Sequence, residues 1–345
     1  MTKSKKIKRV AIALPAVLLI AGIIFFLVQN TFRFDEQEIR IDTPEGIMTG
    51  VLAMPKDHVK PVGLVVFVHG DGPTDATYDD GYKPLWEAFA DEGYASLSLN
   101  KRGIGGSEGS WLDQNMEDRA RDTEYAVRWA RLQPDIDPDR IGLWGASQAG
   151  WVIPKVARDE PKLAFAILVA PAVNWIRQGQ YNTHAALKHE GASAERIEEV
   201  ERRDAAVLEL LRSGASYETY RKKAGEGESS PISRERWTFI RKNFEEDSTD
   251  ELAFFKQPVH LVLGGRDLNV DSDNTEKVYR AGISEKLLSV TRLPDAEHSM
   301  LKRQLSESDS LAVLTAVFMP RELFDDGYLS DMRAFLRIMN ENETE

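Results

Sequence analysis

The sequence predicts an α/β fold: a mainly parallel sheet with helices on both faces, a helical cap insertion and a transmembrane helix at the N-terminus. Three observations lead to this prediction. Between residues 63 and 293, short and almost continuously apolar segments alternate with amphipathic helical patterns, as is typical of parallel sheets covered on both sides. Residues 174–256 interrupt that alternation without any strand pattern, and residues 10–28 form an uncharged apolar run.

The uncharged run at 10–28 predicts an uncleaved signal anchor. As a helix with a rise of about 1.5 Å per residue it would span roughly 28 Å, close to the hydrocarbon thickness of a bilayer. Five basic residues within 1–9 predict a cytoplasmic tail, which would place the folded body on the extracytoplasmic side of a single-pass membrane protein.

Two other interpretations of residues 10–28 are open. A cleaved signal peptide would give a secreted protein, but the run is longer than a signal's apolar region of roughly 7–15 residues and no small-x-small cleavage site follows it. A buried soluble helix is disfavoured because the run is apolar on every face.

Composition limits the partners and the chemistry. Hydrophobic residues make up 42% of the chain, which is enough for a buried core, and a net charge of −12 repels phosphate backbones, so we expect no nucleic-acid partner. The absence of cysteine excludes disulfides, thiolate metal ligands and a cysteine nucleophile. The six histidines show no metal-ligand spacing, so we expect neither a metal nor another cofactor.

The core of the fold is expected over residues 32–173 and 257–345. Alternating segments at 33–42 and 47–55, separated by a Thr-Pro-Glu-Gly turn, predict an antiparallel hairpin. The remaining strands are predicted at 63–69, 94–99, 140–144, 163–169, 259–263 and 287–293, with helices at 82–92, 116–132 and from 148 onward.

The stretch 174–256 is rich in charged residues and helix formers. Ile197, Val200 and Leu211 recur along it at helical spacing, which indicates a helix with one apolar face. We interpret the stretch as a helical cap over the C-terminal edge of the sheet. The alternative is a helical decoration remote from any site.

Ser147 is the candidate nucleophile. It lies in the segment GASQAG at 145–150, directly after a predicted strand and before a predicted helix, where a sharp turn would raise its hydroxyl above the sheet. The N–H of Gln148, at the start of that helix, would point to a developing oxyanion. Ala149 departs from the G-x-S-x-G pattern, but alanine is also small.

A literal G-x-S-x-G occurs at 105–109, with Ser107 at its centre. This segment lies several residues after its strand, in a glycine-rich loop, and no helical pattern begins after the serine. We therefore interpret Ser107 as a turn residue.

A serine nucleophile needs a base and an acid that orients the base. His298 follows the last predicted strand and is the candidate base, and Asp267 follows the strand at 259–263 and is the candidate acid. The order serine, acid, histidine is the one that this strand–turn–helix arrangement requires. Three nearby aspartates remain alternatives for the acid: Asp271, Asp273 and Asp295.

The segment HGDGP at 69–73 follows the strand at 63–69. Its glycines allow main-chain N–H groups to approach a substrate oxygen, so the Asp71 N–H is the candidate second oxyanion donor. We expect His69 to shape the turn and to take no part in proton transfer.

These segments, together with NKRGIGGSEG at 100–109, resemble the α/β-hydrolase superfamily over roughly residues 32–345, most of 174–256 excepted. They are most similar to bacterial esterases and serine-aminopeptidase-like hydrolases that read HGSGP after the third strand. The resemblance implies a serine–aspartate–histidine triad beneath a cap.

Carried over by matching motif, the triad is Ser147, Asp267 and His298, and the oxyanion donors are Asp71 and Gln148. The commonest spelling has neither the aspartate in the oxyanion turn nor Ala149. An aspartate there would disfavour acidic substrates unless its side chain points away.

The function predicted from these residues is hydrolysis of a small-molecule carboxylic ester through an acyl-enzyme. Peptides or amides are the second substrate class and thioesters the third, because fold and triad do not define the acyl group. A membrane-surface lipase is a further alternative, although the acidic body offers no attraction to anionic lipids. A catalytically inactive, membrane-tethered binding or scaffold protein is the alternative from another class, and the membrane partner in all of these rests on residues 10–28.

Overall fold

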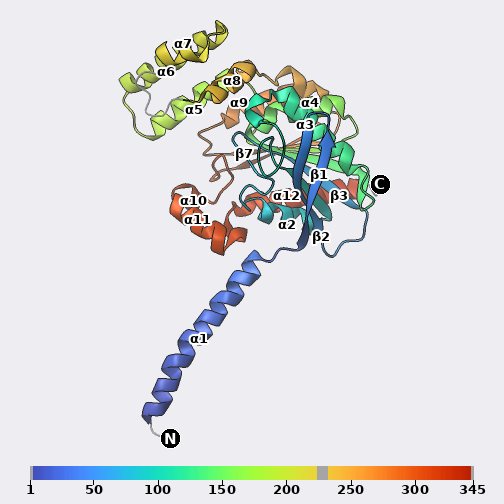
Figure 1. Ribbon diagram of the computed structural model, residues 1–345, viewed down its shortest axis with the longest axis vertical. Coiled ribbons are helices and arrows are strands. Elements are labelled where there is room, and N and C mark those ends of the chain that lie inside the picture. Colours follow the sequence, from blue (N-terminus) through green and yellow to red (C-terminus); the bar gives the residue numbers. More distant parts are fainter. Residues whose placement is uncertain (1–2, 224–231, 343–345) are drawn as a thin grey trace.

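An eight-stranded sheet organises the chain, whose computed structural model describes residues 3–223 and 232–342. The strand order is β1-β2-β4-β3-β5-β6-β7-β8, antiparallel between β1, β2 and β4 and parallel from β4 to β8 (Figure 1). The strands are β1 (Phe34–Thr43), β2 (Gly46–Pro55), β3 (Val62–Val68), β4 (Tyr94–Leu99), β5 (Ile136–Ala146), β6 (Ala166–Val169), β7 (Val259–Gly264) and β8 (Leu288–Leu293).

Helices cover both faces of this sheet, which explains why every residue of β3, β4, β6 and β7 is buried. On one face, α3 (Met116–Ala130), α4 (Ile153–Asp159) and α9 (Ser272–Gly282) contribute to one apolar core. On the other face, α2 (Lys83–Asp91) and α12 (Asp326–Asn342) contribute to a second. The predicted mainly parallel sheet with helices on both faces is confirmed.

The described residues between β6 and β7 include the α-helices α5 (Trp175–His189), α6 (Ala194–Arg212), α7 (Tyr217–Lys223) and α8 (Arg234–Asn243). They share a small apolar cluster of their own, centred on Tyr220 and Trp237, whose rings stack at 4.5 Å. Figure 1 shows α6 and α7 at the opposite end of the molecule from the N-terminal helix. The remaining short helices are η1 (Trp111–Asp113), η2 (Ser147–Trp151), η3 (Asp250–Phe254), α10 (Arg303–Ser306), α11 (Asp309–Phe318) and η4 (Pro320–Glu322).

The N-terminal helix α1 (Lys3–Asn30) corrects the expectation for residues 10–28. Among residues 3–223 and 232–342, no helix combines the length and the apolar character that crossing a bilayer requires. The predicted transmembrane helix, the signal anchor and the single-pass membrane location are therefore wrong.

The C-terminal end of α1 is held by the folded body. Phe26 packs edge-on against Phe318 of α11, with ring centroids 6.0 Å apart. Arg321 donates to the carbonyl oxygens of Val28 and Gln29, both at 2.7 Å, and so satisfies carbonyl groups that the end of a helix leaves without intrahelical partners.

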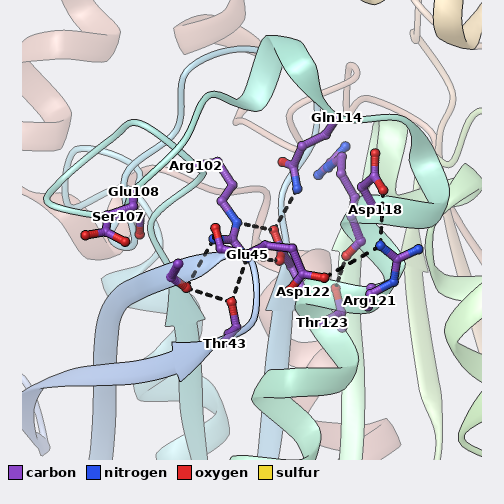
Figure 2. A network of polar contacts seen from close by, with 12 residues as sticks. Thr43, Glu45, Arg102, Ser107, Glu108, Gln114, Asp118, Arg121, Asp122 and Thr123 are labelled. Carbon is purple, nitrogen blue, oxygen red and sulfur yellow. Dashed lines mark hydrogen bonds and ion pairs between the residues drawn. The ribbon is translucent and has the colours of Figure 1, made fainter.

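A buried ion pair fixes the loop after β4 to the β1–β2 turn and to α3. Arg102 donates to both carboxylate oxygens of Asp122, at 3.0 and 2.5 Å, and to the Glu45 carbonyl oxygen at 3.0 Å (Figure 2). Gln114 donates to the same carboxylate at 2.7 Å. The neighbouring residue, Lys101, is thereby placed beneath the loop after β3.

We expect Asp122→Ala to lower the free energy of unfolding by about 3 kcal/mol, because it leaves the Arg102 charge buried without its carboxylate. The Arg102 side chain is only 5% exposed. Asp135→Ala is the matched control: it breaks the exposed Lys60–Asp135 pair and should cost less than about 1 kcal/mol. Urea unfolding measures both, and equal losses would contradict the structural role given to Asp122.

Candidate active site

Ser147 lies where β5 ends and η2 begins, at the carboxyl edge of the parallel strands. Its backbone has φ +56°, in the left-handed region that side-chain-bearing residues rarely adopt. Strain of this kind is typical of a nucleophile held on a sharp strand-to-helix turn. The side chain is half-buried, so the hydroxyl remains accessible.

The packing around this turn requires small residues. A Cβ on Gly145 would lie 2.6 Å from the Cβ of Ala149, and a Cβ on Gly150 would lie 2.2 Å from the carbonyl oxygen of Ala172. Both contacts are impossible, so positions 145 and 150 must be glycine. Ala149 itself is fully buried and its methyl group fills the space above Gly145, which explains the departure from the second glycine of the motif.

Asp267 and His298 are hydrogen-bonded to each other. Nδ1 of His298 lies 2.8 Å from Oδ2 of Asp267, whose side chain is fully buried. The other carboxylate oxygen accepts from the N–H groups of Asn269 and Val270 at 2.7 and 2.8 Å. Because a carboxylate only accepts, Nδ1 carries the proton and Nε2 is left as the basic nitrogen.

The three alternative aspartates are engaged elsewhere. Asp271 accepts from a main-chain N–H as the N-cap of α9, and Asp273 pairs with an arginine of β8 at 2.7 Å. Asp295 lies 3.7 Å from an arginine of α10. None of them contacts His298 in the part of the chain that the structure describes.

Ser147 and His298 lie at the same edge of the sheet, because β5 to β8 are parallel neighbours and each residue follows the carboxyl end of a strand. Within residues 3–223 and 232–342, no hydrogen bond joins the Ser147 hydroxyl to His298. Such contacts commonly tighten only in the substrate complex.

The candidate oxyanion turn lies directly against the nucleophile. A Cβ on Gly70 would be 3.4 Å from the Cβ of Ser147, which places Asp71 next to the serine. Gln148 is 3% exposed and its side-chain amide donates to Oδ1 of Asp71 at 3.2 Å. The Gln148 N–H belongs to the first turn of η2, where helical geometry provides no acceptor.

Two buried cations hold this turn, and sequence reasoning missed both. Lys101 donates to the carbonyl oxygens on either side of Asp71, at 2.6 and 2.7 Å. Arg119 donates to the His69 carbonyl oxygen at 2.6 Å and to the side-chain oxygen of Gln148. Because Lys101 lies within the motif at 100–109, the sequence indicates that it is near the site but does not indicate that it binds the oxyanion turn. Arg119 has no signal among the charged residues of its helix.

A third cation comes from α8. The Arg236 guanidinium donates to both carboxylate oxygens of Asp71, with NH1 at 2.9 Å from Oδ1. It lies over the rings of Phe239 and Trp111, 4.9 and 5.6 Å from their centroids. Nothing in the sequence near Arg236 distinguishes it from the other arginines of the insertion.

The charges at the turn shift the pKa values in opposite directions. Burial lowers the pKa of Lys101 well below its usual range and lowers the pKa of Arg119 to about 10. Burial alone would raise the pKa of Asp71, but the hydrogen bonds and the charge of Arg236 outweigh it, so the pKa lies below its usual value. Asp71 therefore stays ionised beside the nucleophile.

Helix α5 also reaches the triad residues. The Tyr181 hydroxyl donates to the Asp267 carbonyl oxygen at 2.9 Å, and Asn182 donates to the next carbonyl oxygen along the chain at 3.1 Å. Both α5 and α8 thus contact the loops that carry the candidate site, and we keep the interpretation of 174–256 as a cap.

His69 supports the turn from within the core. Its Nε2 lies 2.6 Å from the Leu99 carbonyl oxygen, so Nε2 is the donor and Nδ1 accepts from Tyr82 at 3.2 Å. Burial, with the nearby Lys101 charge, lowers the pKa of His69 to about 3. His69 is therefore neutral at pH 7 and both of its nitrogens are occupied.

Ser107 is built into the fold. Its hydroxyl donates to the Asn100 carbonyl oxygen at 3.0 Å and accepts from the Thr49 N–H at 2.9 Å. The side chain is buried, as expected for a turn residue, despite the literal G-x-S-x-G around it.

A second serine–histidine–aspartate contact lies away from the site, between β7, β8 and α12. His260 lies 2.7 Å from the Ser289 hydroxyl and 2.7 Å from an Asp331 carboxylate oxygen. Ser289 lies within the edge strand β8 and not at a strand-to-helix turn, so it lacks oxyanion donors of the kind found at Ser147. Among residues 3–223 and 232–342, no cluster of three or more His, Cys, Asp or Glu side chains is arranged to hold a metal ion.

Comparison with known proteins places this geometry in a family. The family model described as X-Pro dipeptidyl-peptidase (S15 family) matches residues 48–298, which is more than half of the chain. Within that segment lie Ser147, Asp267 and His298.

Individual relatives are more distant. The quorum-quenching protein AidA of Acinetobacter baumannii is 29% identical over 137 residues, which cover 39% of this chain and 43% of AidA. Dipeptidyl-peptidase 5 of Porphyromonas gingivalis is 28% identical over 147 residues, 41% of this chain and 21% of the relative. The chain thus spans less than half of either relative.

Among solved structures, Est1E from Butyrivibrio proteoclasticus has a TM-score of 0.54 at 15% identity, and the match covers 89% of this chain and 99% of Est1E. At that identity the likeness shows the fold alone. The family match supports serine hydrolase chemistry, and the likeness to Est1E agrees with the fold described above.

The neutral, buried state of His69 predicts an acid-dependent loss of stability. The pKa of His69 is about 6.5 in the unfolded chain and about 3 in the fold, so the unfolded state binds the proton first as the pH falls. Between pH 7 and pH 5 this should lower the free energy of unfolding by about 2 kcal/mol. Urea unfolding at pH 7 and pH 5 measures this difference in the free energy of unfolding. The difference should be smaller in His69→Asn than in the wild type, even if the variant is less stable at both pH values. An unchanged pH dependence would contradict the assignment.

Proposed function

Since the chain belongs to the X-Pro dipeptidyl-peptidase (S15) family and to the α/β-hydrolase superfamily, we propose that it is a serine hydrolase that cleaves carboxylic esters. The observation that carries the proposal is the Asp267–His298 hydrogen bond at the sheet edge where Ser147 follows β5. The strained φ of Ser147 supports its part as the nucleophile.

In the proposed first step, Nε2 of His298 takes the proton of the Ser147 hydroxyl as the oxygen attacks the ester carbonyl carbon. The carbonyl oxygen becomes an oxyanion, which accepts hydrogen bonds from the N–H groups of Asp71 and Gln148. When the carbon–oxygen bond to the alcohol breaks, His298 returns the proton to the leaving oxygen. An acyl-enzyme on Ser147 remains.

In the second step, water replaces the alcohol. His298 takes a proton from the water as it attacks the acyl carbon, and the same N–H groups hold the second oxyanion. Collapse restores the Ser147 hydroxyl and releases the carboxylic acid. Asp267 keeps the proton of His298 on Nδ1 throughout and stabilises the charged imidazolium.

Peptide hydrolysis is the second candidate, and the family match favours it. A dipeptidyl-peptidase substrate carries a protonated amino terminus. The turn beside Ser147 carries two guanidinium groups, those of Arg119 and Arg236, against the single carboxylate of Asp71. This balance disfavours an ammonium group near the nucleophile, so we place esters first, amides second and thioesters third.

We expect a fluorophosphonate probe to label the full chain and Ser107→Ala and Ser289→Ala, but not Ser147→Ala, because only Ser147 has a base and oxyanion donors at a strained turn. Labelling is read by mass spectrometry. The labelled preparation should hydrolyse p-nitrophenyl esters faster than Gly-Pro-p-nitroanilide; the reverse order would favour the peptidase. A folded wild type without label would instead favour a binding protein without catalysis.

Asp267→Asn should lower kcat by roughly 10³- to 10⁴-fold with little change in KM, because the amide no longer fixes the proton on Nδ1. Asp295→Asn, which removes an exposed carboxylate from the same loop as His298, is the matched control and should leave kcat within about twofold. A larger loss in the control than in Asp267→Asn would assign the acid to Asp295. Rates on one p-nitrophenyl ester suffice.

A further inference from the structure

Three cationic side chains surround the oxyanion turn, and one carboxylate faces all of them. Lys101 is 7% exposed and donates only to main-chain carbonyl oxygens. Arg119 is equally buried and donates to one carbonyl oxygen and to Gln148. Neither forms an ion pair within residues 3–223 and 232–342. After Arg236 and Asp71 neutralise each other, the Arg119 guanidinium leaves an excess of positive charge beside Ser147.

This local excess contrasts with the chain as a whole, whose net charge is −12. Buried cations without a carboxylate are costly, because desolvation is not repaid by an ion pair. The turn therefore has the electrostatic character of an anion-binding site.

Arg236 is the cation that a ligand can reach. Its side chain is 27% exposed and that of Asp71 is 42% exposed, so the pair faces solvent and can open. The planar fork of a guanidinium binds any carboxylate through two parallel hydrogen bonds, the geometry that Asp71 adopts here. The ring of Phe239 in α8 and the ring of Trp111 in η1 both pack against this guanidinium.

The carboxylate that binds the Arg236 guanidinium belongs to the residue that follows Gly70. Gly70, which adjoins the Ser147 side chain, is followed directly by Asp71, whose carboxylate accepts from Gln148 as well as from Arg236. Asp71 therefore links the Arg236 guanidinium to the turn that adjoins Ser147.

We propose that Arg236 determines specificity by binding a carboxylate on the substrate, and that the Asp71 carboxylate occupies this position until the substrate displaces it. The inference rests on the proposed serine hydrolase function and names its substrate class: esters that carry a second, negatively charged group. Arg119 supplies the remaining positive charge at this turn, and Lys101 holds the turn's carbonyl oxygens in place.

The test compares two matched ester pairs with the full chain. The first is 4-nitrophenyl hydrogen glutarate against 4-nitrophenyl pentanoate, with the carboxylate on the acyl side. The second is 3-acetoxybenzoate against phenyl acetate, with the carboxylate on the leaving group. The readout is the ratio of kcat/KM for the anionic ester to that for the neutral ester.

Arg236→Gln should lower this ratio about tenfold or more in at least one pair, as expected for loss of a charge-assisted bidentate contact. Arg241→Gln removes an exposed arginine of the same helix and should leave the ratio unchanged. Asp71→Asn should raise the ratio, because the internal competitor for Arg236 is gone. Opposite signs in the two variants distinguish a ligand site from a structural ion pair.

The proposal is overturned if Arg236→Gln leaves the ratio unchanged in both ester pairs. It is also overturned if Arg236→Gln and Asp71→Asn each lower the turnover of neutral and anionic esters to the same extent, because the ion pair would then only hold the cap in place. If Arg236→Gln does not fold, the wild-type ratio is measured at low salt and at 0.5 M NaCl. Screening should lower it, and a salt-independent ratio overturns the inference. Fluorophosphonate labelling and neutral-ester turnover of the wild type report separately on the proposed function.

Discussion

The left-handed backbone of Ser147 is the constraint on which the site depends. A residue at φ +56° persists only when its surroundings hold it there, and here the main chain at Gly145 and Gly150 packs too closely against its neighbours to leave room for a side chain. Because β5 must end and η2 must begin at this residue, the hydroxyl leaves the sheet and the Gln148 N–H turns toward the same space. Relaxing the turn would displace the proposed nucleophile and a proposed oxyanion donor together.

The parallel strands bring the remaining parts to that point. β3, β5, β7 and β8 all end at one edge, so the loops that carry Asp71, Asp267 and His298 meet there although up to 227 residues separate them in the chain. The segment between β6 and β7 leaves from the same edge, which explains why Tyr181 and Arg236 reach residues of the site. The strand order of the sheet, more than the local sequence, brings the candidate site residues together.

Local patterns nevertheless predicted much of this arrangement. Apolar runs located the strands, and small residues around Ser147 located the turn, because both depend on neighbours in the chain. The positions of Lys101, Arg119 and Arg236 depend on contacts across 31, 50 and 165 residues, which no periodicity records. The transmembrane prediction was wrong because it relied on the uncharged run at 10–28, whereas no helix in the described part of the chain has the length and apolar character of a membrane span.

An aspartate in the oxyanion turn presents an electrostatic problem that the fold resolves. A carboxylate next to Ser147 would repel the negative charge that develops on the substrate oxygen. Arg236 forms an ion pair with the Asp71 carboxylate. Lys101 and Arg119 bind main-chain carbonyl oxygens of the turn. The cations that make Asp71 tolerable thus also leave the turn positive overall. Substrate selection and oxyanion stabilisation therefore depend on the same charges, and a change to one cation should alter both.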